Sequence, residues 1–195
     1  MDIKIQSNKI KIIISTAALI VAFGAILIVS GFYPIAFVGG RFITWQNLRH
    51  STQVAFHYYK AASQTYGGSS DDLNKPENIQ EVNRAILDKL IENKIILKGL
   101  ESIPEASRIV KNKVDQALKQ STNLKEAVNA LYGINVDDFT ELILVPQSRK
   151  EVLEGRLTLE NKNFDDWLKE TKKTTKVLIL LNDFSWDGEK VVLKK

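Results

Sequence analysis

The sequence predicts a mainly α-helical domain that is closed by a small antiparallel sheet and preceded by a transmembrane helix. Three observations predict this architecture. Residues 12–40 carry no charged side chain, apolar residues recur at three- and four-residue steps through much of residues 45–174, and short strand-like segments stand only at the two ends of the remaining chain. About 160 residues follow the apolar segment, which is enough for one domain with a substantial core.

The dense apolar run covers residues 12–33 and predicts a membrane-spanning helix. About 20 helical residues cross a hydrocarbon core of about 30 Å, and a backbone in lipid must satisfy its own hydrogen bonds. Three lysines precede the run within the first eleven residues, and the first charge beyond it is Arg41. The positive-inside rule therefore places the N-terminus in the cytoplasm and the rest of the chain outside.

This orientation divides the chain into three parts. Residues 1–11 form a cytoplasmic basic tail, residues 12–33 a single-pass signal-anchor in the cytoplasmic membrane, and residues 34–195 an extracytoplasmic domain. The alternative is a cleaved signal peptide, whose apolar region is typically about 7 to 15 residues long and ends at a small-x-small site. The run here is longer, and Ser30-Gly31 continues directly into Tyr33, so an uncleaved anchor is favoured.

A β-hairpin follows the anchor. The pair Gly39-Gly40 suits a type I′ turn, in which both central residues need a positive φ. A period of two places Ile35 and Phe37 on the same face of the first strand. Because a lone hairpin is marginal in water, we expect it to pair with the apolar run at residues 177–181, predicted to be a strand with both faces covered.

Helices fill the middle of the domain. Thr44 stands where an N-cap is expected, and Pro146 should bend or split the helix that contains it. The Asp187-Gly188 pair, with Trp186 before it, suggests a turn before a further strand. The predicted helices are 45–66, 77–101, one opened by Pro104, a short one capped by Ser121 or Asn123 and ending at Gly133, one through 139–153, and 163–176.

The first of these helices carries the candidate site. Its aromatic residues are Trp45, Phe56, Tyr58, Tyr59 and Tyr66. Most of them follow the apolar stripe and should pack against the helix at 77–101, whereas Tyr58 falls off the stripe and should be exposed. Binding of polypeptides needs adaptable apolar surface, so these five residues form our candidate polypeptide-binding site.

The sequence favours no catalytic residue, cofactor or metal site. There is no cysteine, and the only histidines, His50 and His57, are seven residues apart without nearby carboxylates. Acidic pairs such as Asp137-Asp138 stand at predicted helix starts, where the helix dipole explains them. No Gly-rich phosphate loop, G-x-S-x-G or H-E-x-x-H pattern occurs.

Charge also argues against nucleic acid as a partner. The net charge is +4, and the first eleven residues supply half of it through three lysines and one aspartate. The remainder is small and evenly mixed, unlike a nucleic-acid surface. The lysines at 169, 172, 173 and 176 form a basic cluster, which we interpret as a solvated face, with acidic lipid headgroups or envelope polymers as the alternative ligands.

Several segments resemble a known family. "FVGGRFITWQNL" resembles the opening of the SurA/PrsA chaperone core, a pattern close to V-N-G-x-x-I-T-x-x-x-L, with Gly39 in place of the usual Asn. "AILDKLIENKIILKGLESI" is similar to its leucine-rich second signature, and "KNKVDQALKQ" to its next helix. The likeness covers most of residues 35–181, and its specificity lies in the order and spacing of the segments.

The resemblance implies a chaperone module that binds unfolded or exported polypeptides outside the cytoplasmic membrane. Many members carry a parvulin-type prolyl isomerase domain before the last helix, but here only a few residues separate "LEGRLTLE" from "NFDDWLKE". The expected function is therefore non-catalytic polypeptide binding. The alternatives are a divergent peptidyl-prolyl isomerase and a docking or scaffold subunit of an envelope complex.

Overall fold

A computed structural model describes residues 24, 29–65 and 75–194 of the chain. The predicted basic tail and most of the predicted signal-anchor at 12–33 lie outside these residues. Within the described part, no helix combines the length and the apolar character needed to cross a bilayer. The prediction of a mainly helical fold with small antiparallel sheets is confirmed.

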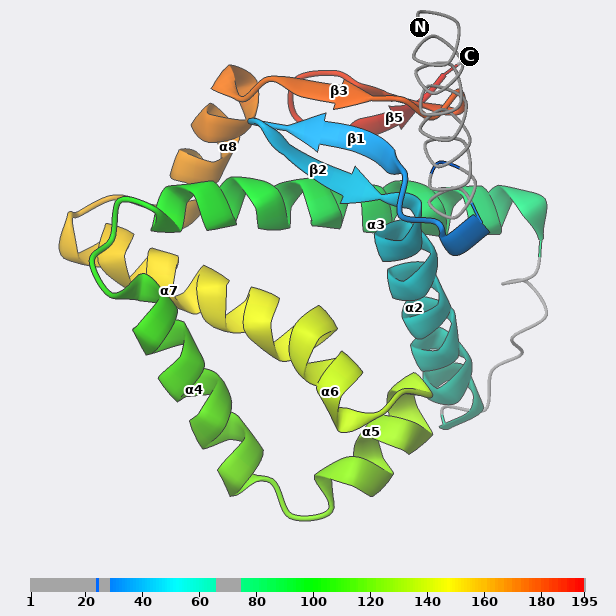
Figure 1. The fold of residues 1–195 in the computed structure, drawn as a ribbon, viewed down its shortest axis with the longest axis horizontal. Helices are drawn as coiled ribbons and strands as arrows, with labels where there is room; N and C mark the ends of the chain where they lie inside the picture. The colour runs from blue at the N-terminus through cyan, green and yellow to red at the C-terminus, as the bar shows by residue number, and fades with distance from the viewer. Residues whose placement is uncertain (1–23, 25–28, 66–74, 195) are drawn as a thin grey trace, which may run out of the picture.

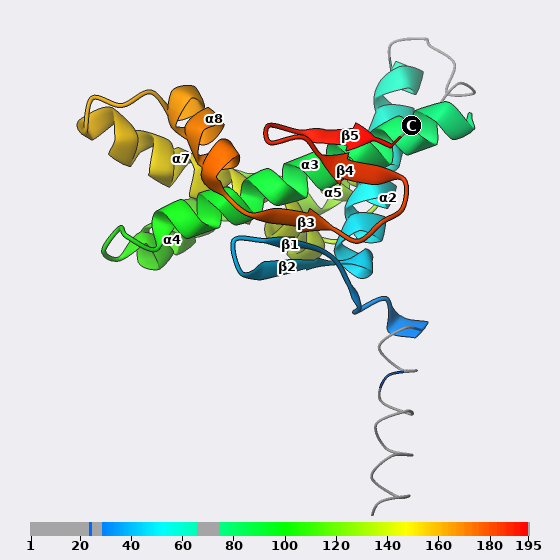
Figure 2. The ribbon, with the colours of Figure 1, turned by 90° about the horizontal axis from the view of Figure 1, so that it is seen from above.

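Helix α3 is the central element of the fold. In Figures 1 and 2 it runs across the molecule, with both sheets on one side and most of the other helices on the opposite side. The strands are β1 (Pro34–Val38), β2 (Arg41–Thr44), β3 (Val177–Ile179), β4 (Phe184–Trp186) and β5 (Val191–Leu193). The helices are α2 (Trp45–Thr65), α3 (Pro76–Leu100), α4 (Ala106–Gln120), α5 (Leu124–Tyr132), α6 (Val136–Phe139), the π-helix η2 (Thr140–Leu144), α7 (Val145–Leu159) and α8 (Phe164–Thr174).

The first sheet joins the two ends of the domain. Its strand order is β2-β1-β3 with both pairings antiparallel, and Phe37 lies opposite Phe42 on β2 and Leu178 on β3. Gly39 and Gly40 both have positive φ, as the predicted turn requires. The predicted pairing of the early hairpin with the late strand is confirmed.

Two predictions about strand faces are wrong. A register shift between Pro34 and Ala36 leaves Ile35 buried beside Ala36, so Ile35 does not share a face with the exposed Phe37; such a bulge adds one residue to the strand and breaks the alternation. Strand β3 is not covered on both faces either. It is the edge strand, and Leu178 is 52% exposed because only the opposite face packs toward α3.

The core divides into two clusters that share α3. One lies between α3 and the sheets and includes Ile35, Ile43 and Ile91, all almost fully buried. The other lies between the C-terminal half of α3 and helices α4, α7 and α8, and includes Ile96 and Leu153. Trp167 and Leu168 on α8 pack against both clusters, so α3 is held from two sides.

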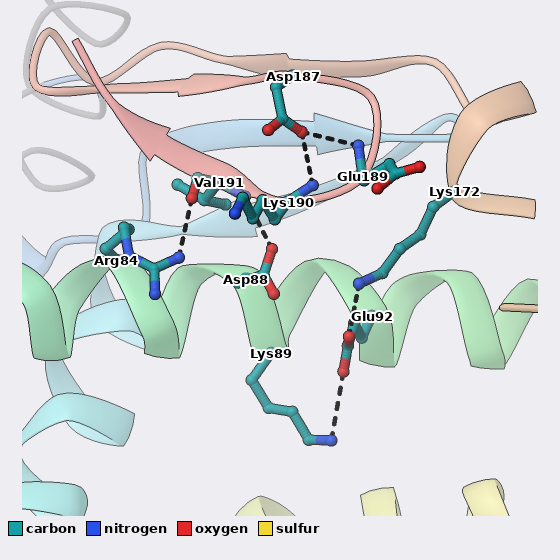
Figure 3. A network of polar contacts seen from close by, with 9 residues as sticks. All are labelled: Arg84, Asp88, Lys89, Glu92, Lys172, Asp187, Glu189, Lys190 and Val191. Carbon is teal, nitrogen blue, oxygen red and sulfur yellow. Dashed lines mark hydrogen bonds and ion pairs between the residues drawn. The ribbon is translucent and has the colours of Figure 1, made fainter. Parts of the chain in front are cut away.

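Polar side chains of α3 hold the C-terminal hairpin. Asp88 Oδ1 accepts a hydrogen bond of 2.8 Å from the backbone N–H of Val191, and Arg84 Nη1 donates one of 2.9 Å to the Val191 carbonyl (Figure 3). One turn further along α3, Glu92 pairs with Lys172 of α8 at 2.6 Å. Successive turns of α3 therefore fix β5 and α8 in place.

The N-cap predicted at Thr44 is confirmed, whereas Asn123 precedes α5 without capping it through its side chain. Thr44 caps α2, because its Oγ1 accepts from Asn47 N–H and Asn47 Oδ1 accepts from the Thr44 N–H, a capping-box arrangement. Asn163 caps α8 through its Oδ1, which accepts from the backbone N–H groups of Asp165 and Asp166. Pro104 does not open α4: that helix starts at Ala106, since Glu105 has a left-handed φ of 58° that a helix cannot continue.

Pro146 interrupts its helix as predicted. The residues before it form the π-helix η2, in which the Val145 N–H donates to the Thr140 carbonyl five residues earlier. Proline lacks the backbone N–H that would donate a hydrogen bond within an α-helix. The single π-helical turn accommodates this missing donor, so the chain stays helical on both sides of it. The turn predicted at Asp187-Gly188 is confirmed: it follows Trp186, the last residue of β4, and the Asp187 carboxylate accepts two backbone N–H bonds there.

Candidate functional site

An apolar cleft of about 460 Å³ opens on the helical side of α3. Helix α2 packs against both α3 and α5, and α6, η2 and α7 connect α5 to the side of α3 (Figure 1). Residues of α2, α3, α5, η2 and α7 line the cleft. Most of its lining side chains are half-buried. The half-buried ones include Ala55, Leu90, Leu97, Tyr132, Leu142, Ile143 and Pro146, whereas Val54 is buried and Tyr58 and Tyr59 are exposed.

Tyrosines form one wall of the cleft. Tyr58 is 41% exposed and Tyr59 is 49% exposed. The Tyr58 ring stacks on Tyr132 of α5 at 5.3 Å between centroids with planes 15° apart, and Tyr132 in turn contacts Phe139 at 5.3 Å. This row of rings joins α2 to α5 and α6, and it presents aromatic surface to solvent.

The contact between α2 and α5 depends on a glycine. Gly133 ends α5 with a φ of 68°, and a Cβ there would lie 2.5 Å from Cδ2 of His57. His57 Nδ1 lies 3.3 Å from the Leu131 carbonyl oxygen. The absence of a side chain at Gly133 therefore lets α5 approach α2 closely enough for the tyrosines to stack.

The five sequence candidates do not gather in one place. Tyr58 and Tyr59 line the cleft, and Tyr58 is exposed as predicted. Trp45 lies elsewhere and stacks on Tyr33 at 6.4 Å, and Phe56 is half-buried outside the cleft lining. Tyr66 lies outside the described residues.

The prediction that Tyr59 belongs to the core is wrong. The face of α2 that is buried is narrower than the apolar stripe, and its buried residues are Leu48, Thr52 and Val54. Beyond Val54, α2 borders the cleft, so the Tyr59 ring faces the cleft instead of a packed neighbour.

Several lining residues were missed from the sequence. Tyr132, Leu142, Lys94 and Arg149 come from α5, η2, α3 and α7, far from the candidate helix along the chain. The sequence around each of them has the apolar periodicity of an ordinary amphipathic helix, so no sequence pattern indicated that they line one cleft. One signal was available: Pro146 predicted an irregular helix, and π-type turns often occur at functional sites.

The opposite wall of the cleft carries positive charge. Burial is the main cause that lowers the pKa of Lys94, and the nearby cations Arg41 and Arg149 lower it further. Burial also lowers the pKa of Arg149, an effect that the carboxylate of Glu141 opposes. On the aromatic wall, burial raises the pKa of Tyr132, so that ring stays neutral.

A second cleft of about 410 Å³ lies between α3, α4 and α7. Leu97 and Arg149 line both clefts and separate them. Its apolar lining includes Val110, Val114 and Leu118 of α4. Of these two clefts, only the first is lined by Tyr58 and Tyr59.

The other candidates from the sequence have structural roles. His50 Nε2 lies 3.9 Å from Asp138 Oδ2, and His57 packs against Gly133. Asp165 and Asp166 stand in the first turn of α8, where the helix dipole favours them. No group of three or more potential metal ligands occurs among residues 29–65 and 75–194.

The basic cluster near the C-terminus is partly paired. Lys172 has a side chain only 12% exposed and bonds Glu92, and Lys173 lies 3.2 Å from Glu170 and 3.9 Å from Glu189. Lys176 is exposed. The four lysines thus do not act as one surface, because the fold turns Lys172 inward toward α3.

Comparison with known proteins finds no relative of this chain. No family model, curated protein or solved structure matches it. What the cleft binds therefore has to be inferred from its shape, its lining and its charges.

Proposed function

We propose that this chain holds unfolded or exported polypeptides outside the cytoplasmic membrane, without catalysis, as a chaperone-like core of the SurA/PrsA type. The observation that carries the proposal is the apolar cleft bordered by α2, α3, α5 and η2, with the half-exposed rings of Tyr58 and Tyr59 at its wall. A concave surface lined mainly by apolar and aromatic side chains is typical of ligand-binding clefts. The order of the helices and the closure of the sheet by β3 agree with the resemblance.

The lining suits ligands of varied sequence. Tyrosine offers a large apolar ring with few rotatable bonds and a hydroxyl that can form hydrogen bonds. Half-buried aliphatic residues such as Leu90, Leu142 and Ile143 complete the surface. Affinity would come mainly from burial of apolar area, at about 25 cal/mol per Å² before the entropy cost of ordering the client.

A signal-anchor at residues 12–33 would keep the cleft beside the membrane. The described end of that segment is fastened to the domain: the carbonyls of Gly31 and Tyr33 accept from the N–H groups of Gln46 and Trp45 at 2.9 and 3.1 Å. These bonds satisfy two free donors at the start of α2. Tethering raises the local concentration of the cleft where chains emerge from the membrane.

The proposal is tested by aggregation of an unfolded client. The 195-residue chain, reconstituted in lipid vesicles, should suppress light scattering by reduced, unfolded lysozyme, whereas empty vesicles should not. The double variant Tyr58→Ser/Tyr59→Ser should bind this client about tenfold less tightly, because two aromatic contacts of about 0.5–1.5 kcal/mol are lost. Phe42→Ser, which removes an exposed ring on the sheet, is the matched control and should act like the wild type.

An unaltered activity in the tyrosine double variant would refute the cleft as the binding site. If neither the wild type nor the control variant suppresses light scattering, the holding function itself is refuted. Both variants change exposed side chains, so folding is checked simply by their circular dichroism spectra.

A second function is favoured by a different surface. Phe42, Phe37 and Leu178 lie side by side across the three strands of the first sheet, on the face turned away from α3, and Phe42 is 58% exposed. Such a row suits docking of one partner protein in an envelope complex. Docking predicts one stoichiometric partner on co-purification, lost in Phe42→Ser and retained in the tyrosine double variant.

A further inference from the structure

The tyrosine-lined cleft is basic as well as apolar. Its charged lining consists of three cations, Lys89, Lys94 and Arg149, and one carboxylate, Glu141. Lys89 is exposed and lies 3.4 Å from Glu92. The other two cations are Lys94 on α3 and Arg149 on α7, and these two helices pack together.

These two cations are poorly compensated. Within residues 29–65 and 75–194, neither Lys94 nor Arg149 has a carboxylate within ion-pair distance. Arg149 interacts with Glu141 at longer range, and the nearest further cation, Arg41, is itself paired with Glu101. A partly buried charge without a partner destabilises the fold, and a bound anion would remove that penalty.

We propose that the cleft selects polypeptide segments in which an acidic side chain lies next to apolar residues. The carboxylate binds between Lys94 and Arg149, and the neighbouring apolar side chains lie against Tyr58 and Leu142. This selectivity rests on the proposed function, polypeptide binding in the same cleft. Charge complementarity favours an acidic ligand, because two cations of the cleft have no ion-pair partner among the described residues and only one carboxylate of those residues lines it.

The polar lining favours a peptide over a fatty acid as the anionic ligand. Ser51 and Asn93 face the cleft, and among the described residues neither side chain has a protein hydrogen-bond partner. A hydroxyl and an amide can donate to and accept from the backbone of an extended segment. A hydrocarbon chain would leave these groups without a partner.

Three peptides test the selectivity on the wild-type chain. They share one apolar core, Leu-Phe-Ile-Val, and are flanked by Asp and Glu, by Lys and Arg, or by Ser and Gln. Isothermal titration calorimetry should show the acidic peptide binding about tenfold more tightly than the basic one, with the neutral peptide between them. Raising the salt concentration should reduce this difference, because screening weakens the charged contacts.

Variants assign the selectivity to the two cations. Lys94→Gln/Arg149→Gln should abolish the difference in affinity between the acidic and the neutral peptide. Arg156→Gln is the matched control, since Arg156 lies on the same helix, bonds Glu160 and is not part of the cleft. Glu141→Gln should strengthen binding of the acidic peptide, because it removes the one carboxylate that the described residues contribute to the cleft lining.

The outcomes separate the two proposals. Equal affinity for the acidic and basic peptides would overturn the charge selectivity and leave polypeptide holding intact. Failure of all three peptides to bind would overturn the proposed function together with the selectivity. The peptide comparison needs no variant, so it decides the question even if the double substitution impairs folding.

Discussion

Two glycines inside helices differ in what surrounds them, and the difference predicts opposite effects of the same substitution. A Cβ on Gly99 of α3 would lie 2.8 Å from the ring of Trp167 and 3.1 Å from Leu153. A Cβ on Gly155 of α7 would meet nothing within 4 Å. Gly99 therefore permits close packing of α3 against α8, and Gly155 has no such role.

Gly99→Ala should lower the free energy of unfolding by about 1–3 kcal/mol, because overpacking displaces Trp167. Gly155→Ala is the matched control and should raise it by about 0.5–1 kcal/mol through helix propensity. Chemical denaturation followed by tryptophan fluorescence measures both values. Stabilisation by both substitutions would show that α8 is not packed closely on Gly99.

At the scale of elements, the C-terminal hairpin β4–β5 depends on polar contacts from α3. Val191 is fully buried, and its N–H and carbonyl bond Asp88 and Arg84 (Figure 3). Asp88→Ala leaves that N–H unpaired and should cost about 1–3 kcal/mol of stability. Asp88→Asn keeps an oxygen acceptor at this position and should cost clearly less.

Denaturant unfolding compares these two variants, and hydrogen exchange of the Val191 amide reports the contact directly. Exchange should be faster in Asp88→Ala than in Asp88→Asn. Equal stability of the alanine variant and the wild type would mean that the hairpin is held by its apolar side chains alone.

At the scale of the whole molecule, the last twenty residues complete a core that begins at the first strand. Ending the chain after Thr175 removes β3 and the buried side chains Phe184 and Val191. Each fully buried side chain of this kind contributes about 1.5–3 kcal/mol, against a total stability of about 5–15 kcal/mol for a typical domain. The truncated chain should therefore lose cooperative thermal unfolding.

A chain ended after Lys194 is the control and should unfold like the wild type, because it keeps the hydrogen bond from the Lys194 N–H to the Asp183 carbonyl. Circular dichroism against temperature compares the two truncations. A cooperative transition retained after removal of residues 176–195 would show that the helices form a stable unit without the sheet.

Much of the fold was predictable because its signals are local. The turn at Gly39-Gly40, the cap at Thr44 and the interruption at Pro146 each follow from the chemistry of a few adjacent residues. The pairing of β1 with β3 followed from the need of a lone hairpin for a partner. Strand faces were less predictable, because one bulge at Ile35 reverses the alternation.

The sequence by itself determined the helices, the hairpin and the joining of the two ends, since hydrophobic period and turn chemistry act over short stretches. Only the tertiary structure decided where the helices leave a hollow. Tyr59 follows the apolar stripe of α2 yet stands half-exposed, because its side chain lines the cleft. Lys94, Tyr132 and Arg149 meet at one cleft because α3, α5 and α7 converge there, and no local pattern encodes that convergence.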